Sequence, residues 1–209
     1  MHAFSDAFQS DLETLMRWRR DVRRFRSDPV DEALLQDCLD TFLLAPSVGL
    51  SEPWRVVRVE SAHARKAALE NFQAANKAAL AGYSGEKAKT YAGLKLSGMR
   101  DAPVQLAVFC DEDTAKGSGL GAGTMPEMRR YSVVSAIMLF WLATRARGLG
   151  LGWVSILDPK QICRDLNVPD TYKLVGYFCL GWPEAVTDSP ELEEQGWEVR
   201  RGHLPLEVR

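Results

Sequence analysis

The segment at residues 131–147 is apolar on nearly every side of a predicted helix. A helix that is hydrophobic all round has to be covered on several sides. We therefore expect this helix to lie at the centre of the fold or at a subunit interface. Its apolar positions are Val133, Val134, Ala136, Ile137, Leu139, Phe140, Trp141, Leu142 and Ala143.

The 209 residues are long enough for one well-packed domain, which we expect to span residues 1–209. Apolar and β-branched runs predict strands, and the 3.6-residue spacing of apolar side chains predicts helices. The predicted strands are 55–59, 104–110, 153–156 and 172–181. The other predicted helices are 8–18, 31–44 and 159–166.

A segment rich in Ala, Lys and Glu at residues 62–91 also predicts helix, with an interruption at 82–85. We read it as part of a helical excursion, roughly 62–100, that either covers a ligand or forms a solvated helical pair. The glycines of 117–123 are spaced G-x-G-x-G, and Pro126 follows before the next helix. A dinucleotide-binding fingerprint needs a tight strand-turn-helix, so we expect a flexible surface loop here instead.

Composition excludes several classes of partner. A formal net charge of −2 and a pI near 6.0 argue against a general nucleic-acid or anionic-membrane surface. The start of the chain lacks an apolar signal region, and no run of about 18 uncharged apolar residues occurs, so we expect a cytoplasmic protein. The cysteines and histidines are scattered, so we expect buried free thiols and no metal site. The cysteines are Cys38, Cys110, Cys163 and Cys179.

Arginines gather where the first predicted helix ends, at Arg19, Arg20 and Arg23. Guanidinium groups present planar forks of donors that match phosphate oxygens, although basic side chains also favour helix C-termini without any ligand. The cluster therefore indicates either an anion site or a solvated helix end. Asp21 lies among these cations. If the arginines hold a ligand phosphate, we expect Asp21 to stay ionised, because neighbouring positive charge favours a carboxylate.

Loops elsewhere have the character of a flat-ring site. Pro46, Ser47 and Gly49 could bring backbone N–H groups close to a ligand, and the glycines before Ser155 could let backbone approach a ring. Together with the arginines, among them Arg200, these loops fit a large phosphorylated aromatic ligand. The histidines offer no convincing Ser-His-Asp or Cys-His arrangement.

Several motifs resemble the nitroreductase-like superfamily of FMN proteins, and within it the dimethylbenzimidazole synthases. The motifs are R-R-D-V-R-x-F at 19–25, A-P-S-V-G-x-x-x-P-W at 45–54 and G-x-G-W-V-S-I at 150–156. The segments 84–86, 94–96 and 131–148 also resemble that family in order and spacing. Ordinary nitroreductases usually have Ser in place of Asp21 and Asn in place of Gly49, so these two positions discriminate between the groups.

The resemblance implies an α+β fold with a central, mostly antiparallel sheet flanked by helices, a helical lid and an obligate homodimer with FMN at its interface. It places the FMN phosphate at Arg19, Arg20, Arg23 and Arg200. It places the ring and its surroundings near Pro46, Ser47, Val48, Gly49, Leu94 and Val154.

The family reaction fragments reduced FMN with dioxygen into dimethylbenzimidazole, the lower ligand of cobalamin, and erythrose phosphate. Asp21 matches the family's catalytic Asp and Ser155 the Ser that works with it. An NAD(P)H-dependent flavin reductase is the implied source of reduced FMN. Two alternatives stay open: an FMN-dependent NAD(P)H nitro- or quinone reductase, and a flavin-binding protein without turnover.

Overall fold

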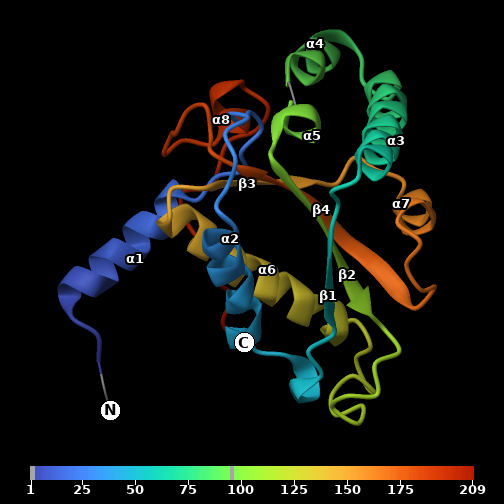
Figure 1. The fold of residues 1–209 in the computed structure, drawn as a ribbon. Coiled ribbons are helices and arrows are strands. Elements are labelled where there is room, and N and C mark those ends of the chain that lie inside the picture. The colour runs from blue at the N-terminus through green and yellow to red at the C-terminus, as the bar shows by residue number, and fades with distance from the viewer. Residues whose placement is uncertain (1–2, 95–96) are drawn as a thin grey trace.

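The chain is built around a four-stranded antiparallel sheet with the strand order β1-β2-β4-β3 (Figure 1). This computed structural model describes residues 3–94 and 97–209, so Lys95 and Leu96 of the sequence motif lie outside it. The strands are β1 (Trp54–Arg58), β2 (Val104–Asp111), β3 (Gly150–Val154) and β4 (Tyr172–Gly181). The predicted α+β fold, with a mostly antiparallel sheet flanked by helices, is confirmed.

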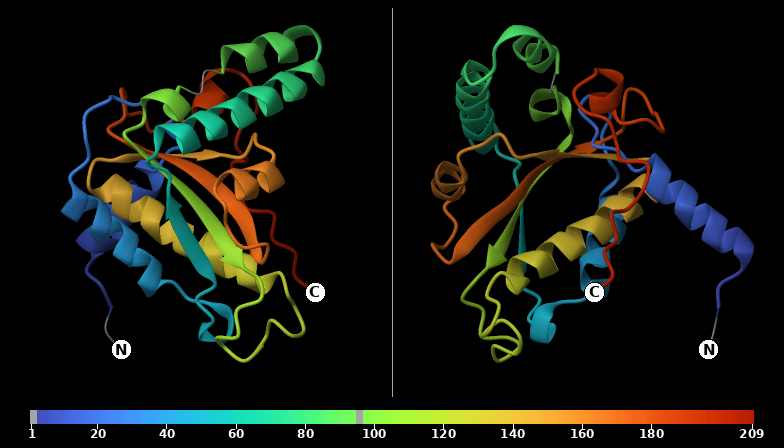
Figure 2. Two further views of the ribbon diagram at one scale, coloured as in Figure 1. Left: turned by 45° about the vertical axis from the view of Figure 1, so that its right-hand side comes forward. Right: turned by 180° about the vertical axis from the view of Figure 1, so that it is seen from behind.

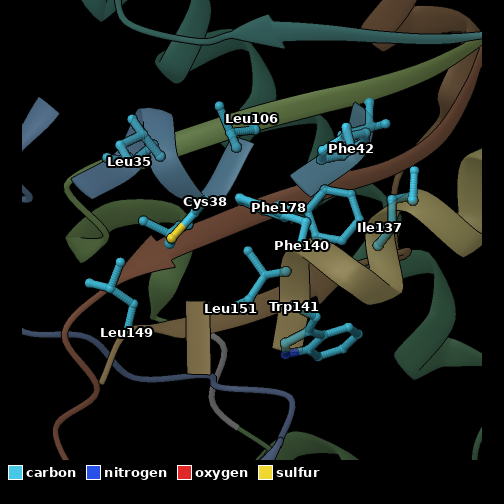
Figure 3. Packing of buried hydrophobic residues seen from close by; sticks show 14 of the residues in the cluster. Leu35, Cys38, Phe42, Leu106, Ile137, Phe140, Trp141, Leu149, Leu151 and Phe178 are labelled. Atoms are coloured by element: carbon cyan, nitrogen blue, oxygen red, sulfur yellow. The ribbon is translucent and has the colours of Figure 1, made fainter. Parts of the chain in front are cut away.

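Helix α6 (Met128–Ala146) covers one face of the sheet, which confirms its predicted central position (Figures 1 and 2). Inward side chains of alternate residues on the central strands, such as Leu106 and Phe178, meet its apolar side together with helix α2 (Glu32–Leu39). Figure 3 shows this cluster, in which Phe140 lies 5.5 Å from Phe42 between ring centroids. The helix and the sheet thus share one core.

The opposite face of the sheet has its own core, because the other alternate residues of the strands point there. Ala107, Phe109 and Tyr177 are fully buried against helices α3 (Ala62–Ala81), α5 (Gly98–Asp101) and α7 (Pro159–Asp165). Cys179 also belongs to this side. Cys163 on α7 is only half-buried, so the expectation of four buried thiols holds for the other three cysteines.

The predicted bounds of the helix at 31–44 and of the strand at 153–156 need correction. The predicted helix 31–44 ends as an α-helix at Leu39 and continues as the 3₁₀ helix η1 (Asp40–Leu44). The predicted bounds 153–156 are wrong for this strand, since β3 runs from Gly150 to Val154. Glycines normally weaken a strand, so the three that precede Trp153 favour a helix end over a strand when only the sequence is considered.

Helix α1 (Asp6–Trp18) is capped at its N-terminus by Ser5, whose hydroxyl accepts a hydrogen bond from Phe8 N at 3.3 Å. It projects away from the body of the chain and has no buried residue, while Phe8, Met16 and Trp18 are exposed (Figure 2). Within the described residues, no helix is both long and apolar enough to cross a membrane.

The helical excursion consists of α3, α4 (Gly85–Gly93) and α5, with the predicted interruption between α3 and α4. The C-terminal tail, which carries helix α8 (Glu191–Glu194), lies against it (Figure 1). Trp197 packs edge-on against Tyr83 at 5.4 Å, and Lys87 lies 4.4 Å from the centroid of the same indole. The excursion and the tail are therefore coupled, and a ligand-covering role stays a prediction.

The loop at 117–123 consists of turns and is not followed directly by a helix, as predicted. It packs against the 3₁₀ helix η2 (Val48–Leu50), where a Cβ on Gly49 would lie 2.9 Å from Gly117 O. Gly49 also has a φ of +58°, so both conformation and space require glycine there.

The close packing of β3 gives a test of the fold. A Cβ on Gly152 would overlap the Val22 carbonyl oxygen, which is backbone and cannot turn away. We expect Gly152→Ala to lower the free energy of unfolding by about 1–3 kcal/mol. Urea unfolding followed by circular dichroism measures the loss. Gly202→Ala in the tail, where an added Cβ meets no described atom within 4 Å, should unfold like the unmodified chain.

Candidate active site

The arginine-rich segment lies alongside β3 as a short parallel bridge between Asp21 and Leu151. Val22 N donates to Leu151 O at 3.0 Å, and Trp153 N donates to Asp21 Oδ1 at 2.8 Å. Gly150 and Gly152 leave the space for this approach. The backbone of β3 therefore holds the Asp21 carboxylate in place through the N–H group of Trp153.

A cleft of about 130 Å³ lies over this segment, between it and the C-terminal tail. It brings together all four arginines that the sequence analysis assigned to a phosphate, and Asp21 lines it as well. The lining residues are Arg19, Arg20, Asp21, Arg23, Pro190, Glu191, Leu192 and Arg200. The alternative of a solvated helix end does not describe this arrangement, because the arginines surround a concave space.

Two of these guanidinium groups have buried nitrogens that form no hydrogen bond. Only 10% of the Arg23 side chain is exposed, and its Nε and Nη1 have no hydrogen-bond partner among the described residues. The same is true of Arg20 Nε, although Arg20 donates to the carbonyl oxygens of Arg19 and Asp188. Buried donors without acceptors are costly, so the cleft is suited to an anion that accepts from them.

Mutual repulsion and burial make the cluster more receptive to negative charge. The pKa of Arg19 is lowered by burial and by Arg200, and its guanidinium stacks 4.7 Å from the Trp141 ring centroid. The pKa of Arg20 is lowered by burial, by Arg200 and by Arg19. An anion in the cleft would relieve this repulsion.

That Asp21 stays ionised beside a bound phosphate stays a prediction, and in the ligand-free chain the arginines are not the strongest influence on its pKa. Burial raises the pKa of Asp21, and this outweighs the hydrogen bond from Trp153 N and the charges of Arg23 and Arg19. Glu191 raises it further. The side chain of Asp21 is nevertheless 40% exposed, so solvent weakens the effect of burial on its pKa. A raised pKa brings this carboxyl closer to a role in proton transfer near neutral pH.

The second predicted motif lies at the other end of α6. Val48 N donates to Ser132 Oγ at 3.0 Å, whereas Trp141 Nε1 donates to Arg20 O at 3.2 Å. Ser132 and Trp141 are about 13 Å apart along the helix at about 1.5 Å per residue. Pro46, Ser47, Val48 and Gly49 are thus not part of the arginine cleft of the same chain.

The remaining predicted residues are placed as follows. Val154 is buried at the end of β3 and lines a small crevice that also includes Asp21. Ser155 is exposed just beyond the strand, and its hydroxyl forms no hydrogen bond within the described part of the chain. Leu94 caps the C-terminus of α4 and lines neither this crevice nor the arginine cleft. The structure brings Val154 to Asp21 but shows no contact between Asp21 and Ser155.

Sequence reasoning missed two contributors to the cleft. The sequence predicts Trp141 only as a core residue, yet the Arg19 guanidinium stacks on its ring. Glu191 lies in an acidic tail without periodicity, and only its 3.8 Å approach to Arg23 Nε reveals its position. No cluster of three or more His, Cys, Asp or Glu side chains with metal-binding geometry occurs among residues 3–94 and 97–209.

Comparison with known families agrees with this arrangement. Residues 16–182 match the Nitroreductase family. The chain belongs to the nitroreductase family. The match includes the arginine segment, the sheet and α6, so the nitroreductase domain accounts for nearly everything except the N-terminal helix and the tail.

Two curated nitroreductase relatives are similar over nearly their whole length. The 5,6-dimethylbenzimidazole synthase of Rhodospirillum rubrum is 52% identical over 200 residues, covering 96% of this chain and 95% of the relative. The protein of that name from Rhodobacter capsulatus is 48% identical over 204 residues, covering 98% and 97%. The family resemblance inferred from the sequence motifs is confirmed.

Solved nitroreductase-like structures support the fold. Iodotyrosine deiodinase bound to FMN and 3-iodo-L-tyrosine superposes with a TM-score of 0.73 at 21% identity, covering 95% of this chain and 97% of that one. A nitroreductase-like protein from Streptococcus mutans gives a TM-score of 0.71 at 17% identity, with 96% and 100% coverage.

The raised pKa of Asp21 predicts how stability depends on pH. Below about pH 3.9, the usual value for an unfolded aspartate, Asp21 is protonated in both states and imposes no penalty. As pH rises through the folded pKa, ionisation is opposed in the folded state, so stability is lost. Asp21→Asn should therefore melt at a higher temperature than the unmodified chain near pH 7, with no advantage near pH 3.

Thermal unfolding of ligand-free protein at the two pH values measures this difference. Asp28→Asn is the matched control, because the exposed Asp28 is hydrogen-bonded to Arg26 and its pKa is lowered. That variant should gain nothing at pH 7. An Asp21→Asn variant that melts below the unmodified chain at pH 7 would contradict the assignment.

Proposed function

We propose that this protein is a 5,6-dimethylbenzimidazole synthase, which fragments reduced FMN with dioxygen to give dimethylbenzimidazole and erythrose phosphate. One observation carries the proposal: Asp21 lies on the wall of a cleft where buried guanidinium nitrogens of Arg20 and Arg23 have no acceptor among the described residues. Relatives of that name share about half of their residues with this chain over nearly the full length.

The arginine cleft fits the phosphate of FMN. A phosphate monoester carries about −1.5 to −2 charges near neutral pH and several acceptor oxygens. Arg23 and Arg20 supply buried donors that have no partner in the described part of the chain, and Arg19 and Arg200 add positive charge. We assign these four residues to the phosphate, because ligand binding would satisfy donors that the free chain leaves unsatisfied.

Asp21 is the residue we assign to proton transfer. Its Oδ1 accepts from Trp153 N, so the backbone of β3 fixes the carboxylate while the other oxygen faces Arg23 and the cleft. Because burial raises its pKa, the carboxyl can both accept and return a proton with less cost than a solvated aspartate. Ser155 is assigned as its partner by family resemblance, and its exposed hydroxyl forms no hydrogen bond with the residues that the structure describes.

The distance between the two sets of predicted residues supports a homodimer. Pro46, Ser47, Val48 and Gly49 line the far end of α6 from the arginine cleft. The apolar residues Tyr131, Val134 and Met138 lie exposed on α6 at helical spacing, and α1 exposes further apolar side chains. We propose that a second copy covers these faces and brings its 46–49 loop, and Leu94 of one of the chains, to the flavin ring.

Other parts of the proposal rest on the chemistry of the substrate. Reduced FMN is consumed, so an NAD(P)H-dependent flavin reductase has to supply it, and dioxygen is the second substrate. Both are available in a cytoplasm, where we place the protein. No nucleic-acid or membrane partner enters the proposal, in agreement with the net charge of −2.

The decisive test is incubation of the purified protein with reduced FMN in air. We expect mass spectrometry to detect dimethylbenzimidazole. Asp21→Asn should still bind FMN and should lose about 100- to 10,000-fold of the product-forming rate, the usual contribution of acid–base catalysis. Asp28→Asn, which changes an exposed carboxylate near Arg26, should form product at the unmodified rate.

Two outcomes would overturn the proposal. Steady oxidation of NAD(P)H with FMN retained through many turnovers would identify a nitro- or quinone reductase. Return of only oxidised FMN would identify a flavin-binding protein without turnover.

The proposed dimer has its own test. Light scattering after gel filtration should give about twice the chain mass of 23.3 kDa. Met138→Glu places a charge on the exposed apolar side of α6 and should shift the protein toward the monomer, because an unpaired charge is costly to bury in an interface. Lys66→Glu reverses the charge of an exposed residue on helix α3 and should leave the mass unchanged. A monomeric unmodified chain would contradict the shared site.

A further inference from the structure

Glu191 is placed where the proposed catalytic carboxylate and the proposed phosphate site meet. It is the first residue of α8, and 19% of its side chain is exposed. Its Oε2 lies 3.8 Å from Arg23 Nε, and its Oε1 lies 3.3 Å from Arg24 Nη1. The arginine cleft and a neighbouring, larger cleft both include Glu191 and Asp21 in their walls.

Arg23 is shared between two carboxylates. Its Nε lies 3.8 Å from Asp21 Oδ2 and 3.8 Å from Glu191 Oε2, and it forms a hydrogen bond with neither. The Arg23 backbone is fixed, because Gly98 N donates to Arg23 O at 3.1 Å. A buried guanidinium held between two anions at equal distance attracts each less than it would attract one alone in hydrogen-bonded contact.

The other groups around Asp21 do not duplicate this effect. Trp153 N and Arg19 favour its ionised form, and the buried Cys179 thiol, whose own pKa is raised to about 12 mainly by burial, stays neutral beside it. Arg200 acts on Arg19 and Arg20. Glu191 is therefore the anionic side chain, among the described groups that act on Asp21, that opposes its ionisation.

We propose that Glu191 is a positioning residue that divides the Arg23 guanidinium between itself and Asp21. The proton affinity of Asp21 and the affinity of the cleft for a phosphate monoester then both depend on the Glu191 charge. The second part of this inference rests on the proposed function. Without Glu191, Arg23 would turn to Asp21, which would hold its proton less tightly, and the cleft would repel phosphate less.

The test uses Glu191→Gln, which keeps the size of the side chain and removes its charge. Carbon-13 NMR of the Asp21 carboxyl in the full-length, ligand-free protein, assigned with Asp21→Asn, should show a titration midpoint at lower pH than in the unmodified chain. Fluorescence titration with oxidised FMN at pH 7 should show about threefold to tenfold tighter binding, as expected for removal of one partly screened charge beside the cleft.

Two further variants separate this role from a general change in charge or in α8. Glu194→Gln removes the same charge from the same helix, where Glu194 accepts from Thr187 Oγ1 at 3.2 Å, and it should leave both readouts unchanged. Glu191→Asp keeps the charge. In this variant the titration midpoint of Asp21 should lie closer to that of the unmodified chain than it does in Glu191→Gln. Circular dichroism confirms that each variant is folded.

Several results would overturn the inference. An unchanged Asp21 midpoint in Glu191→Gln would do so, as would an equal change in Glu194→Gln or unaltered FMN affinity. Neither readout requires product formation. Failure to form dimethylbenzimidazole therefore tests the proposed function separately from the role of Glu191.

Discussion

The close approach of the arginine segment to β3 is the constraint on which the site depends. Gly150 and Gly152 remove the side chains that would keep the segment away, and the hydrogen bond from Trp153 N then holds Asp21 at 2.8 Å. The same approach places the Arg20 carbonyl oxygen where it accepts a hydrogen bond from Trp141 Nε1 of α6. Strand, arginine segment and central helix thus fix one another, and the positive cluster is formed on a rigid base.

Most of the fold could be predicted because its signals are local. The apolar surface of α6, the continuous hydrophobic run of β2 and the break between α3 and α4 each follow from composition and spacing within one segment. The bounds of β3 could not be predicted this way. Its glycines leave space for Val22, a residue more than a hundred positions away in the sequence. A glycine kept for close approach has the same local signature as one that ends a helix.

The site was predictable in its cations and less so in its electrostatics. Arg19, Arg20 and Arg23 adjoin in sequence, so their clustering is a local property. The pKa of Asp21 depends instead on how much protein surrounds it and on Glu191, and neither follows from the identity of the neighbours. Sequence proximity to arginine reveals only the neighbouring cations that favour ionisation of Asp21, whereas burial has the larger effect on its pKa.

The division of the predicted residues between two ends of α6 has a structural meaning. One chain presents the clustered arginines at the C-terminal end of the helix and a strained glycine-containing loop at the other, where Leu50 and Glu52 also have positive φ. Strained backbone persists where surrounding structure fixes it, and it often belongs to binding sites. In an antiparallel pair of such helices, the loop of each chain would face the arginines of the other. In the proposed homodimer, the apolar exposure of α6 and the separation of the two sets of residues would follow from the same requirement, a ligand held between two copies.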